Sequence, residues 1–186
     1  IPIYANPPTA NTLTRGPKGT EINFHIFQTG APFSIGNLTL EPFHIPHDAS
    51  EPVGFRISHA NTHIGIVTDI GMSTHLVIEK LKGCSCLVIE ANHDVDLLRE
   101  APRPWSLKQR IRSRQGHLSN VEAAQLISAS ATDQLKHIIL AHLSSDCNTP
   151  ETALNTVGSQ LRLEQLDHLT LEVSRAKEPT AIWRSQ

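Results

Sequence analysis

The chain has 186 residues, a net charge of −2 and a hydrophobic content of 39%. This length predicts one domain with a sizeable core, and the charge excludes a globally basic nucleic-acid-binding protein, so any contact with nucleic acid would need a local basic patch. The sequence shows neither an apolar run of the roughly 20 residues that a transmembrane helix needs nor the basic start and apolar stretch of a signal peptide.

The cysteine count favours a reducing compartment. The three cysteines are odd in number, and Cys84 and Cys86 lie in C-x-C spacing, which is a poor basis for a disulfide framework. We therefore expect a cytoplasmic protein that does not enter a membrane. Cys84 and Cys86 are expected near the edge of a strand, because a zinc knuckle would need more ligands than these two.

The first half of the chain predicts mainly strands. Residues 1–20 are rich in turn formers and predict a connection with little helix. Alternating apolar residues predict strands at 21–28, 31–35 and 37–45. Residues 53–59 and 62–69 then predict a hairpin.

The second half alternates helices with short apolar strands. A helix over 73–83 has Ser73 or Thr74 as its cap and Gly83 as its stop. A second helix opens with the capping box of Ser119 and Glu122, and a third has Pro150 at its first position. The predicted helices span 73–83, 105–114, 119–130 and 149–161, and the predicted strands span 86–91, 137–142 and 168–173. This order predicts an α/β fold in which helices cover sheet layers, although the alternation also permits a doubly wound sheet.

Polar residues lie at the carboxyl ends of the predicted strands, where a site would assemble. They are His47, Asp69, Glu90 and His142, and His117 precedes a helix cap. Histidine is frequent in this chain, with 11 residues, and it is the commonest metal ligand in proteins. Two histidines and an aspartate suit zinc or manganese, and a carboxylate can bridge two ions. The alternative is that these are ordinary histidines at strand ends, bonded to the backbone, because no H-E-x-x-H motif is present.

The segment 103–114 is a second functional candidate. Its cations can hold phosphates without reading bases, and the alternative is a solvated helix face. Trp105 is expected to be a packing anchor rather than a platform for base stacking. The basic residues, which no acidic residue interrupts, are Arg103, Lys108, Arg110, Arg112 and Arg114.

The remaining histidines have simpler interpretations. His44 is expected on the surface, because it and His47 point to opposite faces of an extended strand. His93 lies close to Glu90 in the sequence and is expected to line the site, and Asn148 could contact substrate or cap a helix. Surface or sheet-face positions are expected for His25, His59, His63, His75, His137 and His168.

Five segments in a fixed order resemble the metallo-β-lactamase fold, and more narrowly its YycJ/WalJ-like branch, which is related to ribonuclease Z. The resemblance covers roughly residues 1 to 165 and implies an α/β fold of the αββα sandwich type. The segments are "IPHDASEPVGFRI", "IGIVTDIG", "LVIEANHD", "QGHLSN" and "IILAHLS".

The resemblance implies a role for each of the strand-end residues. His47 would bind one divalent ion, His142 would bind a second, and Asp69 would bridge the two, with zinc or manganese as the metal. Glu90 and His117 would form a pair that moves a proton to the leaving oxygen. His93 would line this site.

One departure from the family pattern limits what the chain is expected to do. The His-x-His-x-Asp-His motif of the family does not occur in this sequence, and it normally precedes a segment like "IPIYAN". We therefore expect residues 1–186 to be a single domain that forms the C-terminal part of the fold, without the first strands and the first metal motif. Three remaining ligands would bind metal weakly or in part.

The predicted function is a metal-dependent phosphodiesterase or nuclease that resembles the 5′-to-3′ DNA exonucleases of this branch. Its substrate would be DNA or RNA, contacted through His93, Arg110, Arg112 and Asn148. One alternative is a hydrolase of small esters, thioesters or lactams, which the basic segment disfavours. Another is a non-catalytic remnant without metal, and self-association into a homo-oligomer is left open.

Overall fold

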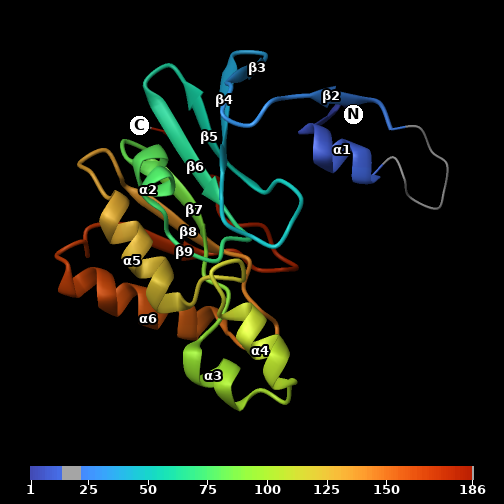
Figure 1. Cartoon of the computed structure of the whole chain (residues 1–186). Coiled ribbons are helices and arrows are strands. Elements are labelled where there is room, and N and C mark those ends of the chain that lie inside the picture. The colour runs from blue at the N-terminus through green and yellow to red at the C-terminus, as the bar shows by residue number, and fades with distance from the viewer. Residues whose placement is uncertain (14–21, 186) are drawn as a thin grey trace.

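A seven-stranded mixed sheet forms the centre of the computed structural model, which describes residues 1–13 and 22–185 (Figure 1). The strands follow one another across the sheet in chain order, from β3 to β9. Their bounds are Phe33–Ile35 (β3), Leu38–His44 (β4), Val53–His59 (β5), Thr62–Val67 (β6), Cys86–Glu90 (β7), His137–Ala141 (β8) and Thr170–Val173 (β9).

Strands β3 to β6 form an antiparallel meander. The turn between β3 and β4 uses Gly36 in a left-handed conformation, with φ at 58°, and Ala60 has a φ of 48° between β5 and β6. Tight hairpin turns need such positive φ values. The hairpin predicted over residues 53–59 and 62–69 is therefore confirmed.

Strands β6 to β9 are parallel, and helices connect them. Each crossover advances by one strand in the same direction, so right-handed connections place α2, α5 and α6 on one face of the sheet. Figure 1 shows α2, α5 and α6 together on that face. The helices are α2 (His75–Leu81), α3 (Val95–Glu100), α4 (Trp105–Ile111), α5 (Asn120–Ser130) and α6 (Pro150–Leu163). The predicted α/β class is confirmed.

Local capping determines where the main helices begin. The Thr74 side chain accepts a hydrogen bond from the amide of Val77 at 3.3 Å, and Ser119 with Glu122 forms the predicted capping box at α5. The Thr149 side chain caps α6 by accepting from the amide of Thr152, and Pro150 is the first residue of that helix. The caps satisfy amides that have no partner inside the helix.

The core lies between the sheet and the three helices. Leu87, Ile89, Ile138 and Leu140 from β7 and β8 are fully buried against Val77, Leu81, Ala124, Ile127, Ala153 and Val157 from the helices. Val88 and Ile139 alternate with these residues, point to the other face and are only partly buried there. The main buried apolar cluster therefore lies on the face of the sheet that the helices cover.

The N-terminal segment differs from the prediction of a connection with little helix. It contains β1 (Ile3–Ala5), helix α1 (Pro7–Leu13) and β2 (Phe24–Ile26), with β1 and β2 paired in parallel. Prolines are compatible with the first turn of a helix, and the Asn6 side chain accepts from the amide of Thr9 at 3.2 Å. Residues 14–21, which hold the rest of the predicted connection and the first residue of the strand predicted at 21–28, lie outside the described residues.

Two helices differ from what the sequence predicted. Helix α3 was not predicted, although Asp94 caps it by accepting from the amides of Asp96 and Leu97 at 3.0 Å. Helix α4 ends at Ile111 rather than at residue 114, because the chain turns there and the His117 amide donates to the Ile111 carbonyl at 2.8 Å. Across the described ranges, no helix has the length and apolar character needed to cross a membrane.

The three cysteines are buried free thiols, and burial raises the pKa of Cys84 and of Cys86 to about 11. Because the thiolate is the reactive form, we expect no reaction of the folded protein with a thiol reagent at pH 8. All three thiols should react after denaturation. The matched control is Ser113→Cys, an exposed position, which should add one reactive thiol to the folded protein. Rapid labelling of the unmodified folded chain would contradict the burial described above.

Candidate metal centre

Strand direction brings the candidate residues to one edge of the sheet. Strands β6, β7 and β8 are parallel, so their carboxyl ends deliver Asp69, Glu90 and His142 to the same edge. Strand β4 is separated from β6 by two antiparallel pairings, so it runs the same way and carries His47 there. His117 joins them from the long crossover between β7 and β8.

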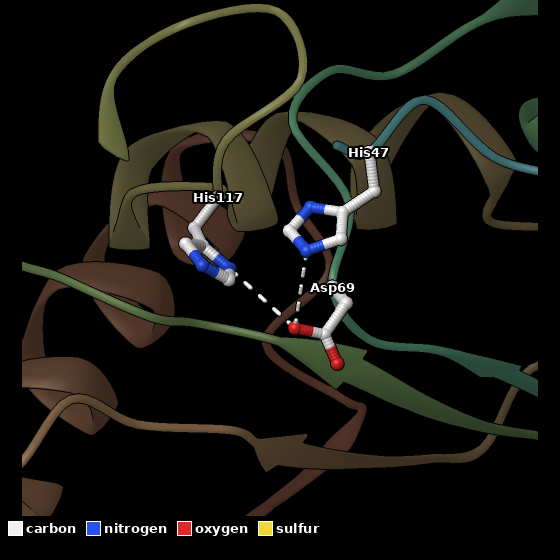
Figure 2. Close-up of side chains that lie close together, drawn as sticks. All are labelled: His47, Asp69 and His117. Carbon is white, nitrogen blue, oxygen red and sulfur yellow. Dashed lines mark ion pairs between the residues drawn. The ribbon is translucent and has the colours of Figure 1, made fainter. Parts of the chain in front are cut away.

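The Asp69 carboxylate contacts three of the histidines, and Figure 2 shows it facing the rings of His47 and His117. Its Oδ1 atom is 3.6 Å from Nε2 of His47 and 3.6 Å from Nε2 of His142. The same atom is 3.9 Å from Nδ1 of His117. Three imidazoles on three separate loops thus face one carboxylate oxygen.

The backbone orients the ring of His47. Its Nδ1 atom donates to the carbonyl oxygen of Gly116 at 2.9 Å. A carbonyl can only accept, so the proton of the neutral ring is on Nδ1 and the lone pair is on Nε2. That lone pair faces Asp69, as required of a metal ligand whose other nitrogen is held by a hydrogen bond.

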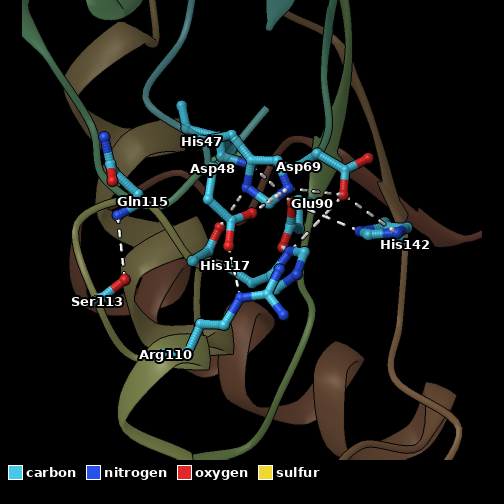
Figure 3. Close-up of polar contacts among 11 residues, drawn as sticks. His47, Asp48, Asp69, Glu90, Arg110, Ser113, Gln115, His117 and His142 are labelled. Atoms are coloured by element: carbon cyan, nitrogen blue, oxygen red, sulfur yellow. Dashed lines mark hydrogen bonds and ion pairs between the residues drawn. The ribbon is translucent and has the colours of Figure 1, made fainter. Parts of the chain in front are cut away.

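Glu90 is the only carboxylate among the described residues that is fully buried. It accepts from the Ile70 amide at 3.0 Å and pairs through Oε1 with Nδ1 of His117 at 2.8 Å (Figure 3). Its Oε2 atom lies 3.6 Å from Nδ1 of His142. Burial raises the pKa of Glu90, but the contacts with His117 and His142 outweigh this effect, so the pKa falls below its usual value.

His142 lies between two carboxylates. The contact with Glu90 raises the pKa of His142, and burial opposes this rise. Both His142 and Asp69 have left-handed backbones, with φ at 57° and 54°. Such backbones cost energy in residues other than glycine and are concentrated at functional sites, and here they turn the chain just after β8 and β6.

Backbone contacts tie together the loops that carry His47, Asp69 and His117. The Gly71 amide donates to the Pro46 carbonyl at 2.8 Å, and the Asp48 amide donates to the Gln115 carbonyl at 3.1 Å. A Cβ atom on Gly71 would lie 2.5 Å from backbone atoms of Arg114 and Gly116. The close approach of these loops therefore requires glycine at position 71.

The donor set fits a divalent ion. Two groups each place three ligand atoms within 4.8 Å of one another: His47, Asp69 and His117, and Glu90, His117 and His142. Three protein ligands with an open position are typical of catalytic zinc. His117 belongs to both groups, so these residues do not make two independent complete sites. His142, which the sequence predicted as a metal ligand, also faces Asp69. With His142 as the ligand, His117 is available to pair with Glu90.

A cavity of about 340 Å³ opens beside His117 and His142. Arg103 and Arg110 line it, and each is held by a carboxylate: Arg103 contacts Asp146 at 2.5 Å, and Arg110 contacts Asp48 at 2.5 Å. Arg110 lowers the pKa of Asp48. The pairing with Arg110 was not foreseen, although the position of Asp48 next to His47 was a signal that could have suggested it.

The four residues predicted to contact substrate lie in different surroundings: one lines the cavity, one is exposed elsewhere and two are buried. Arg110 lines the cavity, whereas Arg112 is exposed on another face of the same segment. His93 is 2% exposed, and burial lowers its pKa. The Asn148 side chain is also buried; it donates to the Ala91 carbonyl at 2.8 Å and exchanges hydrogen bonds with Asn120. These positions argue against substrate contact by His93 and Asn148 and favour structural roles.

The other histidines lie outside the group. His44, His25, His59, His75 and His168 are exposed. His63 is partly buried on the sheet, where its Nδ1 pairs with the Ser58 hydroxyl at 2.8 Å. His137 lies 3.6 Å from Glu172, at the opposite end of β8 from the candidate site.

The close loop contact gives a direct test. Gly71→Ala should lower the free energy of unfolding by about 1–3 kcal/mol, a typical cost of overpacking, and should displace the loop that carries His117. Thermal denaturation measures the effect. The matched control is Gly158→Ala in α6, where the added Cβ would be 3.7 Å from Leu171. That change should be neutral or stabilising by up to about 1 kcal/mol, and equal destabilisation by both variants would contradict the proposed packing.

Comparisons with known proteins identify relatives of this chain. The chain is 38% identical over 163 residues to exodeoxyribonuclease YycJ of Bacillus anthracis, which covers 87% of this chain and 61% of that protein. It is 33% identical over 162 residues to exodeoxyribonuclease WalJ of Streptococcus pneumoniae, covering 86% and 60%. The chain thus spans about 61% of the length of the first of these relatives.

Solved structures share the fold at low sequence identity. The metallo-β-lactamase fold protein YhfI of Bacillus subtilis matches 94% of this chain and 62% of its own, with a TM-score of 0.68 and 14% identity. Zn²⁺-bound PqqB of Methylobacterium extorquens matches 94% of this chain and 62% of its own, with a TM-score of 0.63 and 13% identity. Residues 1–142 match the family model described as the beta-lactamase superfamily domain. The chain therefore belongs to the beta-lactamase superfamily and has the metallo-β-lactamase fold.

Proposed function

We propose that this chain is the part of a metal-dependent phosphodiesterase that carries Asp69 and the Glu90–His117 pair, with DNA as its substrate. The observation that carries the proposal is the position of Asp69, whose Oδ1 lies 3.6 Å from Nε2 of both His47 and His142. The relatives at 38% and 33% identity are named exodeoxyribonucleases, which supports DNA over RNA. The 5′-to-3′ direction stays a prediction from the resemblance.

His47, Asp69 and His142 would hold the metal. A divalent ion there, zinc or manganese, supplies a water of lowered pKa and stabilises charge on the phosphate oxygens. His47 is suited to this task because Gly116 fixes its tautomer. In this proposal the Asp69 carboxylate lies beside both His47 and His142. This position would let two ions share the carboxylate.

Glu90 and His117 would handle the proton. The hydrogen bond of 2.8 Å from Nδ1 of His117 to Glu90 holds the ring in place, so Nε2 is the nitrogen that exchanges a proton with the leaving oxygen. Glu90 would thereby keep the His117 ring oriented toward the leaving oxygen. Arg103 and Arg110 line the cavity beside His117 and add positive charge where a phosphate would lie.

Two broader expectations belong to the same proposal. We take residues 1–186 as one domain, because Tyr4 and Phe27 stack on Phe33 with ring centroids 5.5 and 5.1 Å apart and thereby join the N-terminal segment to the sheet. The three free cysteines support a reducing compartment, and the cytoplasm is the compartment that we propose.

Metal content and DNA cleavage test the assignment together. We expect Asp69→Ala to lose bound zinc or manganese, measured by mass spectrometry of the metal, and to lose cleavage of labelled DNA. His117→Ala should keep the metal bound by His47, Asp69 and His142 but cleave DNA about 100- to 10,000-fold more slowly, the usual contribution of a positioned acid or base.

The matched control is His44→Ala, because His44 lies three residues before His47 and is exposed at the end of β4. It should change neither metal content nor cleavage. Cleavage that survives both Asp69→Ala and His117→Ala would refute the assignment.

A further inference from the structure

Trp105 is not the packing anchor expected from the sequence. Its side chain is 63% exposed at the start of α4. Together with Lys108, Gln109 and Arg112 it borders a surface hollow of about 370 Å³. These four positions are spaced i, i+3, i+4 and i+7, so they share one face of the helical turn. We call this set the α4 platform.

The opposite face of α4 belongs to the candidate active site. Leu107 and Ile111 pack on a small apolar cluster that contains Leu98 and Cys147. With Arg110 they also line the cavity beside His117 and His142. One helix therefore borders both the cavity and the platform, which are separated by about its diameter of 10–12 Å. That span corresponds to roughly three nucleotide steps of 3.4 Å.

The charges of this segment are not all compensated. Arg103 and Arg110 have carboxylate partners, Asp146 and Asp48. Lys108 donates to the Arg99 carbonyl at 2.6 Å, a partner without a negative charge. Throughout residues 1–13 and 22–185, no carboxylate lies within 4.0 Å of the charged groups of Lys108 and Arg112.

An exposed indole beside two uncompensated cations fits a single-stranded nucleic acid. Every base can stack on an aromatic ring, and each phosphate is attracted by a nearby cation. A protein partner would also use tryptophan and arginine, but the cores of protein interfaces are depleted in lysine and charged groups. Here every other residue that borders the hollow is polar or charged, which favours the nucleic acid.

We propose that the α4 platform holds a single-stranded segment of nucleic acid a few nucleotides from the reacting phosphate, with Trp105 stacked on a base and with Lys108 and Arg112 on the flanking phosphates. The inference rests on the proposed function for the class of substrate. It adds a binding site outside the metal centre, which would hold the strand that enters or leaves the cavity.

Binding of a fluorescein-labelled oligothymidylate, measured by fluorescence anisotropy, tests the platform without requiring catalysis. Trp105→Ala should weaken binding about 5- to 100-fold, the usual loss per stacked base, and Trp105→Phe should restore part of the affinity. The matched control is Leu163→Ala, which removes another exposed apolar side chain, on α6, and should leave affinity unchanged. Unchanged affinity in Trp105→Ala would overturn the proposal and would favour a protein partner for the exposed indole.

Tryptophan fluorescence gives a second readout. The chain has two tryptophans, so Trp183→Phe leaves Trp105 as the only reporter. Stacking on a base should quench its emission when oligothymidylate is added, and emission that does not change at saturating oligonucleotide would count against the proposal.

The salt dependence of binding tests the cations. Arg112→Ala should reduce the slope of log affinity against log salt by about 0.7, the value for one phosphate contact on a single strand. An unchanged slope would remove Arg112 from the site.

The proposed function is judged separately, by cleavage of bis(p-nitrophenyl) phosphate by the metal-loaded protein. Oligonucleotide binding through Trp105 without any such cleavage would uphold the platform and refute the phosphodiesterase assignment.

Discussion

The buried carboxylate of Glu90 is the constraint on which the arrangement of the site depends. A charge without solvent is costly unless partners satisfy it, and Glu90 finds its partners on three different loops: the Ile70 amide, His117 and His142. Each contact places one loop at the carboxyl edge of the sheet. Removing the carboxylate would therefore release the loop of Asp69 as well as the two imidazoles.

Backbone contacts also hold the loops of the site in place, in addition to the contacts of Glu90. The loop of Asp69 approaches the loop of His117 so closely that Gly71 leaves no room for a Cβ atom, and His47 is fixed by the carbonyl of Gly116. The ring of His47 is thus oriented by a main-chain atom, which cannot change rotamer. Such orientation suits a metal centre, because ligands that are already in place lose little freedom when the ion binds.

The sequence predicted the features that local rules control. Strand ends carry His47, Asp69 and His142, and the caps at Thr74, Ser119 and Thr149 begin the helices as expected. The burial of His93 and Asn148 could not be predicted, because their partners come from distant parts of the chain, as when Asn148 reaches the Ala91 carbonyl. The exposure of Trp105 was missed for a related reason, since aromatic residues are usually buried and only the tertiary fold decides which face of a short helix is covered.

The basic residues of segment 103–114 are another case in which the local sequence pattern does not reveal the tertiary contacts. In the sequence its five cations are equivalent, and with a net charge of −2 the chain as a whole gives no sign of binding a polyanion. In the structure, Asp146 and Asp48 pair with Arg103 and Arg110, from positions 43 and 62 residues away. These pairs anchor α4 to the loops that surround the cavity, and they leave Lys108 and Arg112 uncompensated beside the exposed indole. The carboxylates thus decide which cations are paired with an opposite charge and which are left without one, a distinction that neither net charge nor spacing along the chain contains.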